Sequence, residues 1–118
     1  MNNPWIVMTD NGREHVNKQV LDWVTEAINY GVGEILLNSL DMEGTMKGFD
    51  VRLINEVTKI VKCPVIAHGG AGTIEDKVMA AKSGASGVAI TSMLHYEKFD
   101  FNEIKESLVN SGIFVRMV

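Results

Sequence analysis

Cysteine and proline are both scarce in this sequence of 118 residues. The single cysteine, Cys63, cannot form an internal disulfide or a cysteine-rich metal site, so the sequence is not of the disulfide-stapled class and favours a reducing compartment. We interpret Cys63 as ordinary core packing. Two prolines and a hydrophobic content of 46% are typical of one globular unit with a real core. We therefore treat residues 1–118 as a single domain or a fragment of one.

Basic charge and long apolar runs are also lacking. A formal net charge of −4 argues against nucleic acid or an anionic membrane as the main partner, because both require a basic face. No apolar run approaches the roughly 18 residues that a membrane span needs, and residues 1–4 do not resemble the start of a signal peptide. We expect a cytoplasmic protein with neither a nucleic-acid nor a membrane partner.

What is present is an alternation of short apolar runs and amphipathic stretches. Residues 34–39, 64–67 and 87–90 read as strands, and the first of these runs predicts a strand buried on both faces of a parallel sheet. Residues 20–28 and 53–61 carry apolar side chains at helical spacing. Residues 5–9 form a strand-like run that needs a neighbour. Expected helix caps are Asp50, Thr73 and Asp100, and Gly31 and Gly84 are expected to end helices.

Strands that alternate with helices predict parallel pairing through right-handed crossovers. The fold class is therefore α/β, with about three βα units preceded by a hairpin strand and a helix. Periodicity alone leaves two architectures open, a slice of a (βα)₈ barrel and an open doubly wound sheet. Because a complete barrel takes about 250 residues, about half of one fits in this chain.

In either architecture, functional groups lie where strands end and helices begin. Gly69, Gly70 and Gly72 precede a helix and predict unobstructed backbone N–H groups, which together with the helix dipole would make a phosphate cradle. The alternative interpretation is a tight turn. Ser92 follows the last predicted strand and can cap a short helix, which would complete a two-sided anion site.

Three stretches of the sequence carry a family resemblance. GVGEILLNSLDMEGT at residues 31–45, followed by KGFD at 47–50, resembles strand six of the cyclase subunit of imidazole glycerol phosphate synthase. PVIAHGGAG at residues 64–72 is similar to strand seven of the same family, and SMLH at 92–95 and GIFVR at 112–116 fit its ending. The resemblance covers almost the whole chain and implies the C-terminal half of a (βα)₈ TIM barrel.

The resemblance also implies a reaction. The family condenses ammonia from a glutaminase subunit with a bis-phosphorylated ribulosyl aminoimidazole carboxamide, giving imidazole glycerol phosphate and a purine precursor in histidine biosynthesis. The matching positions would hold one substrate phosphate through Gly44, Gly69, Gly70, Thr91 and Ser92. The middle of the mouth would be lined by Asn38, Asp41 and His68.

Both catalytic aspartates of the family lie at the ends of strands one and five, and neither strand matches this chain. The resemblance therefore implies no catalytic residue here and no activity without the missing N-terminal half-barrel. Glu34, at the start of its strand, matches a glutamate of the charged ring that gates ammonia entry from the glutaminase. The alternative is a strand-start residue bonded to solvent.

Other chemistry-bearing residues have plainer interpretations. No two histidines have metal-ligand spacing, so we expect neither a metal nor a cofactor. His68 departs from the small residue that many family members carry at this position. His15 is expected at the surface and Trp5 and Trp23 in the core, while Met46, Met79, Met93 and Met117 are expected to fill the core or the helix caps.

Two alternatives remain open. One is a paralogue that acts with a sugar amidotransferase in surface-polysaccharide synthesis, an interpretation that His68 and residues 88–96 favour. The other is a non-catalytic half-barrel module that buries its exposed sheet edges by self-association.

Overall fold

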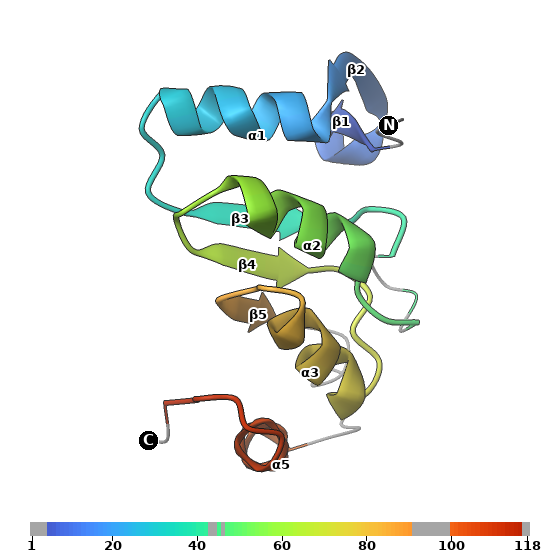
Figure 1. Ribbon diagram of the computed structural model, residues 1–118. Helices are drawn as coiled ribbons and strands as arrows, with labels where there is room; N and C mark the ends of the chain where they lie inside the picture. The colour runs from blue at the N-terminus through green and yellow to red at the C-terminus, as the bar shows by residue number, and fades with distance from the viewer. Residues whose placement is uncertain (1–4, 43–44, 46, 91–99, 117–118) are drawn as a thin grey trace.

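The computed structural model describes residues 5–42, 45, 47–90 and 100–116 (Figure 1). The described strands and helices are β1 (Ile6–Thr9), η1 (Asp10–Gly12), β2 (Glu14–Gln19), α1 (Val20–Asn29), β3 (Ile35–Asn38), α2 (Val51–Ile60), β4 (Val65–His68), α3 (Ile74–Lys82), β5 (Gly87–Ala89) and α5 (Phe101–Asn110). Within these ranges, no helix is long and apolar enough to cross a membrane.

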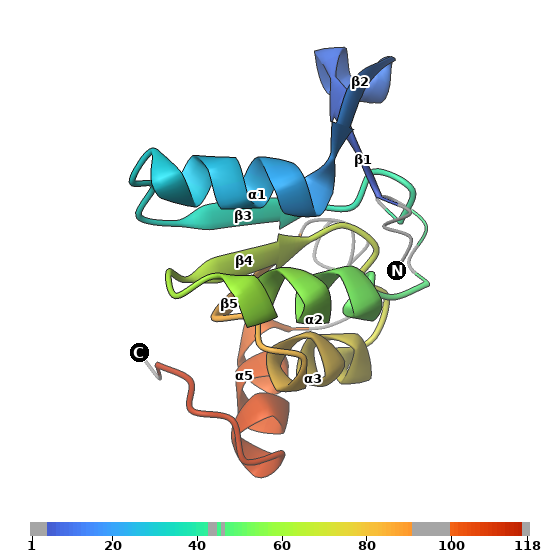
Figure 2. The same ribbon diagram turned by 45° about the horizontal axis from the view of Figure 1, so that its top comes forward.

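The central feature is a parallel sheet in the order β3-β4-β5. Leu37 pairs with Ala67 and Asn38 with His68. Helices α2 and α3 lie on one face of this sheet, and α1 runs alongside β3 at its edge (Figures 1 and 2). The predicted α/β class and parallel pairing are confirmed.

The core lies between the sheet and the helices. Val65 and Ala67 are each 1% exposed and alternate along β4, so both point toward the helices. They meet Val57 of α2, which is fully buried, and Ala80 of α3. Full burial of a valine side chain contributes roughly 1.5–3 kcal/mol, so Val57 and Val65 make this helix-covered face a source of stability.

The opposite face of the sheet is largely uncovered by the described residues. Leu36 is 63% exposed and Asn38 is exposed, while Ile66 and His68 are half-buried. The prediction that residues 34–39 are buried on both faces is therefore wrong. The physical reason is that every described helix that joins the core cluster packs on the side of Leu37, which leaves Leu36 largely uncovered by the described residues.

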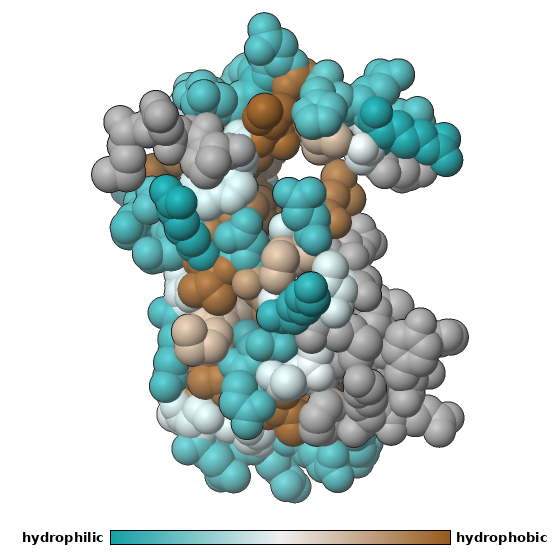
Figure 3. Space-filling model, turned by 90° about the vertical axis from the view of Figure 1, so that its right-hand side faces the viewer, coloured by the Kyte–Doolittle hydropathy of each residue, from teal (hydrophilic) through white to brown (hydrophobic). Residues whose placement is uncertain are grey.

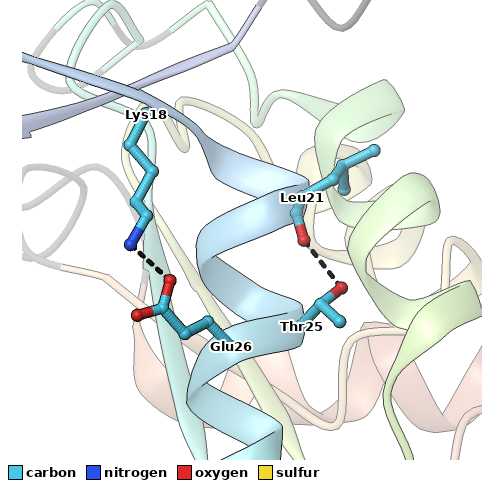
Figure 4. A network of polar contacts seen from close by, with 4 residues as sticks. All are labelled: Lys18, Leu21, Thr25 and Glu26. Atoms are coloured by element: carbon cyan, nitrogen blue, oxygen red, sulfur yellow. Dashed lines mark hydrogen bonds and ion pairs between the residues drawn. The ribbon is translucent and has the colours of Figure 1, made fainter.

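The strand-like run at residues 5–9 finds its neighbour in a hairpin that stands apart from the sheet. β1 pairs with β2 in antiparallel fashion, as the leading hairpin strand required. Lys18 of β2 forms an ion pair with Glu26 of α1 (Figure 4). The Lys18 ammonium also lies 4.7 Å from the centroid of the Trp23 ring, so the hairpin is held against α1.

Several side chains depart from the expected burial. Trp23 is 42% exposed, so its assignment to the core is wrong, and Met79 is 50% exposed, so it does not fill the core. Trp23 stands at the open edge of β3, where the described chain offers no covering element. Trp5 packs against the core cluster, and His15 is exposed as expected. Cys63 is only half-buried.

The expected caps are present at α2 and α3. The carboxylate of Asp50 accepts the N–H of Leu53 at 3.1 Å. At α3 the Thr73 hydroxyl accepts the Asp76 N–H at 3.2 Å, and the Asp76 carboxylate accepts the Thr73 N–H at 2.8 Å, which is a capping box. Gly31 follows α1 with a φ of 87°, the left-handed conformation that ends a helix at glycine.

Candidate functional site

Three of the predicted site residues meet at the carboxyl edge of the sheet. Asn38 ends β3, His68 ends β4, and the two are register partners. The Ser39 N–H donates to the His68 carbonyl at 3.1 Å, which extends the ladder by one residue. A Cβ added to Gly69 would lie 3.1 Å from Asn38 Oδ1. Sequence reasoning thus placed Asn38, His68 and Gly69 in one neighbourhood, and the structure brings them together.

Gly70 holds the turn after β4 against the loop after β3. Its carbonyl accepts the Gly48 N–H at 2.7 Å, and its φ of 100° is left-handed. A Cβ at this position would collide with the Gly48 carbonyl oxygen and would lie 2.8 Å from the Met42 Cβ. Any side chain at position 70 would therefore have to displace the backbone of the loop after β3.

The amides at the start of α3 are not all unobstructed. The Asp76 carboxylate accepts the N–H of Gly72 and the N–H of Thr73, each at 2.8 Å. The expectation of unobstructed N–H groups is therefore wrong for Gly72. Asp76 also adds a negative charge beside the predicted anion site, and an incoming phosphate must approach despite its repulsion.

The remaining predicted site residues are distributed as follows. Asp41 is exposed on the loop after β3. Gly44, Thr91 and Ser92 lie outside the described residues, as does Glu43. The second half of the predicted phosphate site therefore has no described geometry.

Glu34 lies at the other end of β3, immediately before the strand begins, and its residue is exposed. An exposed carboxylate keeps its hydration, so the desolvation cost of a charge that opens a buried strand does not arise here. Glu34 stands at the amino end of the sheet, opposite Asn38 and His68, which is where the sequence placed it.

A groove of about 1100 Å³ runs along β3 from Glu34 to Asp41. Its walls come from the hairpin and from α1, and its floor from β3. Figure 3 views the side toward which the strands point and shows the molecule hollowed near its top, with hydrophobic atoms at the rim. The residues that line the groove include Trp5, Ile6, Trp23, Glu34, Leu36 and Asn38.

Lys77 carries a buried amino group that the sequence did not single out. Its side chain is fully buried, and its Nζ donates to the Thr73 carbonyl at 3.2 Å. Burial lowers the pKa of Lys77 from 10.5 to about 8, against the opposing effect of the Asp76 charge. A sequence signal existed, because Lys77 stands three residues before Ala80, on the buried face of α3.

In the part of the chain that the structure describes, no group of three histidine, cysteine or acidic side chains is arranged to hold a metal ion. The arrangement at the carboxyl edge instead offers an amide side chain, an imidazole and a glycine-rich backbone turn. These groups donate and accept hydrogen bonds, and they suit an anionic, hydroxyl-bearing ligand.

Comparison with known proteins gives consistent results. A model of the family described as histidine biosynthesis protein matches residues 2–100. Imidazole glycerol phosphate synthase subunit HisF of Beutenbergia cavernae is 44% identical over 110 residues, which are 93% of this chain and 43% of the relative. The same subunit of Gluconacetobacter diazotrophicus is 39% identical over 112 residues, or 95% of this chain and 43% of the relative. The chain thus spans less than half the length of these relatives.

Among solved structures, the Amycolatopsis orientalis BexX/CysO complex contains a chain that superposes with a TM-score of 0.57 at 15% identity. The match covers 83% of this chain and 44% of that chain, and at this identity it shows the fold alone. The family match extends over most of the sequence and agrees with the resemblance found at strands six and seven. This chain therefore belongs to the histidine biosynthesis protein family, a family of TIM barrels.

Proposed function

We propose that this chain is the C-terminal, phosphate-binding part of a (βα)₈-barrel cyclase of the imidazole glycerol phosphate synthase type. The observation that carries the proposal is the meeting of Asn38, His68 and Gly69 at the carboxyl edge of a parallel sheet, in a chain about 40% identical to HisF subunits. In a TIM barrel, active sites are built at this edge.

The substrate is a compound with a phosphate at each end. One phosphate is held by groups of the loops after β3, β4 and β5, through Gly44, Gly69, Gly70, Thr91 and Ser92. Asn38, Asp41 and His68 face the middle of the substrate and hold it by hydrogen bonds. At the amino end, Glu34 belongs to the charged entrance through which a glutaminase subunit delivers ammonia.

The acid–base pair of the reaction lies outside this chain. In the resemblance, the two aspartates belong to strands one and five, which no segment here matches. The chain therefore binds and orients one end of the substrate, and proton transfer is supplied by the complementary part of the barrel.

A second candidate is the paralogue that acts with a sugar amidotransferase. The observation that favours it is His68, whose imidazole stands at the strand end beside Asn38. A preference for a substrate other than the bis-phosphorylated imidazole precursor would support this second candidate.

The proposal is tested by titrating inorganic phosphate into the chain and following the amide NMR signals. We expect the largest shifts at residues 69–71 and 91–95.

A charge-removing variant tests the site more sharply. Asp76→Asn keeps an oxygen that can accept the Gly72 N–H but removes the negative charge. It should tighten phosphate binding by about threefold, the effect of one repulsive charge removed at several ångströms in a high dielectric. The matched control is Glu106→Gln, an exposed charge on α5, which should leave the affinity unchanged. Largest shifts elsewhere, or equal affinity in Asp76→Asn and the parent, would contradict the site.

A further inference from the structure

Lys77 puts a positive charge where the fold least favours one. Its side chain is fully buried in the first half of α3, and its Nζ donates to the carbonyl of Thr73, the residue that caps this helix. Burial removes the ammonium from water, and the N-terminus of a helix has a positive potential that repels it. An apolar side chain of similar length would avoid both costs. A buried charge of this kind indicates a role beyond the stability of the fold.

The described charge that acts on Lys77 is the carboxylate of Asp76. It raises the pKa of Lys77, but burial has the larger effect and lowers that pKa to about 8. Asp76 is itself engaged at the glycine turn, because one of its oxygens accepts the N–H groups of Gly72 and Thr73. Both charges are thus bonded to the backbone of Thr73, the ammonium to its carbonyl and the carboxylate to its N–H.

The elements packed against α3 supply no competing charge. α3 lies between α2 and α5 and beside β5, which has no titratable side chain (Figure 1). The charged residues of the two helices and their caps are Asp50, Arg52, Glu56 and Lys59 at α2 and Asp100, Glu103, Lys105 and Glu106 at α5. Arg52 and Lys105 lie over aromatic rings, and Lys59 pairs with Glu56. Within the described part of the chain, none of them shifts the pKa of Lys77.

The turn before α3 is the part of the structure that this charge can serve. The N–H groups of Gly72 and Thr73 are taken by Asp76. Those of residues 69–71, by contrast, donate to no oxygen within the described ranges. Gly69 and Gly70 are also among the residues that the proposed function assigns to a substrate phosphate. The turn thus offers three backbone donors to an anion.

An anion on this turn would experience Asp76 and Lys77 with opposite signs. The Asp76 carboxylate repels it, whereas the Lys77 ammonium attracts it across the protein interior, where the effective dielectric constant is below that of water. The same attraction restores to the ammonium part of the charge stabilisation that it lost on burial. Binding of an anion therefore reduces the cost of the buried ammonium.

We propose that Lys77 is a positioning residue of the anion site at residues 69–71, where its buried ammonium, fixed to the Thr73 carbonyl, offsets the negative charge of Asp76. Lys77 acts through its field and through the helix cap, and it does not touch the anion. The inference rests on the proposed function, which places a substrate phosphate at this turn, and it adds control by proton binding.

Two consequences follow from the proton on Lys77. Because the pKa of Lys77 is about 8, the affinity for an anion falls as the pH rises through that value. Coupling between two binding events is reciprocal, so a bound anion raises the pKa of Lys77 in turn.

The test is a titration of the chain with sulfate, followed by the Cα NMR signals of residues 69–71. Sulfate is a suitable probe because it is a dianion throughout the range from pH 6.5 to 9.5, so that only protein groups change charge. We expect the parent chain to bind sulfate about tenfold more weakly at pH 9.5 than at pH 6.5. Lys77→Met should already bind at pH 6.5 as weakly as the parent binds at pH 9.5, and the step near pH 8 should be absent.

Lys82→Met is the matched control. It makes the same charge change on the same helix, but Lys82 is exposed in the last turn of α3. Its sulfate affinity and pH dependence should equal those of the parent. Circular dichroism verifies that both variants are folded, and removal of a buried charge should stabilise Lys77→Met rather than unfold it.

The Cε NMR signal of Lys77 reports its proton directly, and a lysine with a merely structural role would not respond to sulfate. In the free chain, we expect this signal to titrate with a midpoint near pH 8, below the midpoints of the exposed lysines. In saturating sulfate, the midpoint should move up by about one pH unit, which corresponds to the tenfold difference in affinity.

The outcomes separate the role of Lys77 from the proposed function. Equal sulfate affinity of the parent and Lys77→Met at pH 6.5, or a Lys77 midpoint that sulfate does not move, overturns the inference and leaves the proposed anion site in place. If sulfate shifts no signal of residues 69–71 in the parent, both the inference and the phosphate site of the proposed function are wrong. Weaker binding in Lys77→Met, with the parent's affinity kept in Lys82→Met, supports the inference.

Discussion

Lys77 places an amino group in the interior, between the capping box of α3 and the core. Its pKa is lowered to about 8 by burial, whereas the unfolded chain has the ordinary value of 10.5. Between these values the unfolded state binds more protons than the native state, so the free energy of unfolding rises with pH across this window. Below pH 8 the buried ammonium is charged and its full desolvation cost is present.

We therefore expect Lys77→Met to flatten this pH dependence. At pH 7 the variant should be more stable than the parent by about 2 kcal/mol, since it loses the desolvation cost but also the hydrogen bond to Thr73. Urea unfolding followed by circular dichroism at pH 7.5, 8.5 and 9.5 measures both effects. Parallel pH profiles for parent and variant would show that Lys77 does not titrate in this range.

A comparison of Gly70 with Gly31 distinguishes the two costs of replacing a glycine, which are backbone strain at positive φ and steric overlap of the new Cβ. Both have a left-handed φ, but only Gly70 faces the backbone of another loop, while nothing lies within 4 Å of a Cβ at Gly31. Gly31→Ala should cost about 1–2 kcal/mol from backbone strain alone. Gly70→Ala should cost about 3–4 kcal/mol, because steric overlap adds to that strain. Chemical denaturation measures the free energy of unfolding of both variants. Equal losses of stability would mean that the loop after β3 moves to accommodate the new Cβ at little cost.

At the scale of elements, Asp50 joins the hairpin to α2. One carboxylate oxygen caps the Leu53 N–H, and the other accepts the indole N–H of Trp5 at 3.0 Å. The Arg52 guanidinium lies 5.1 Å from the centroid of the Trp5 ring and adds a cation–π contact. Asp50 thus links the start of the hairpin to α2, in addition to the Lys18 contacts that hold the hairpin against α1.

Asp50→Ala should lower the free energy of unfolding by about 2 kcal/mol, roughly half from the lost cap and half from the lost hydrogen bond. Asp50→Asn keeps one acceptor oxygen, which can still cap Leu53, but places an NH₂ donor against the indole N–H of Trp5, so it should cost about half as much. Thermal unfolding gives the stabilities, and tryptophan fluorescence reports Trp5. If the two variants lose stability equally, the negative charge matters more than the hydrogen-bond geometry.

Element boundaries were predictable wherever a local rule governs them. Asp50 and Thr73 cap their helices, and Gly31 ends α1, because capping depends on residues three or four positions apart. Burial was less predictable. The apolar run of β3 predicted a strand buried on both faces. Such a run does not indicate which elements pack against each face, and Leu36 is exposed.

At the scale of the whole molecule, the chain spans less than half the length of its HisF relatives. Under the proposed function, we expect the purified chain to show no ammonia-dependent cyclisation, because the proposed acid–base pair lies outside residues 1–118. Co-expression with the unmatched part of the Beutenbergia cavernae subunit should produce turnover. Steady-state assays with ammonium salt and a no-protein control measure it. Turnover by the chain alone would place the acid–base pair within residues 1–118.

The sequence by itself determined the α/β alternation, the parallel strands, the caps and the family, because periodicity, capping and motif spacing are local properties of the chain. It also identified Asn38, His68 and Gly69 as neighbours, since parallel strands end at one edge. Only the tertiary structure decided that Asp76 takes the Gly72 amide, that Gly70 is packed against Gly48, and that Lys77 is buried. These facts depend on how loops and helices pack across the fold, and such packing is set by distances between segments that no local pattern encodes.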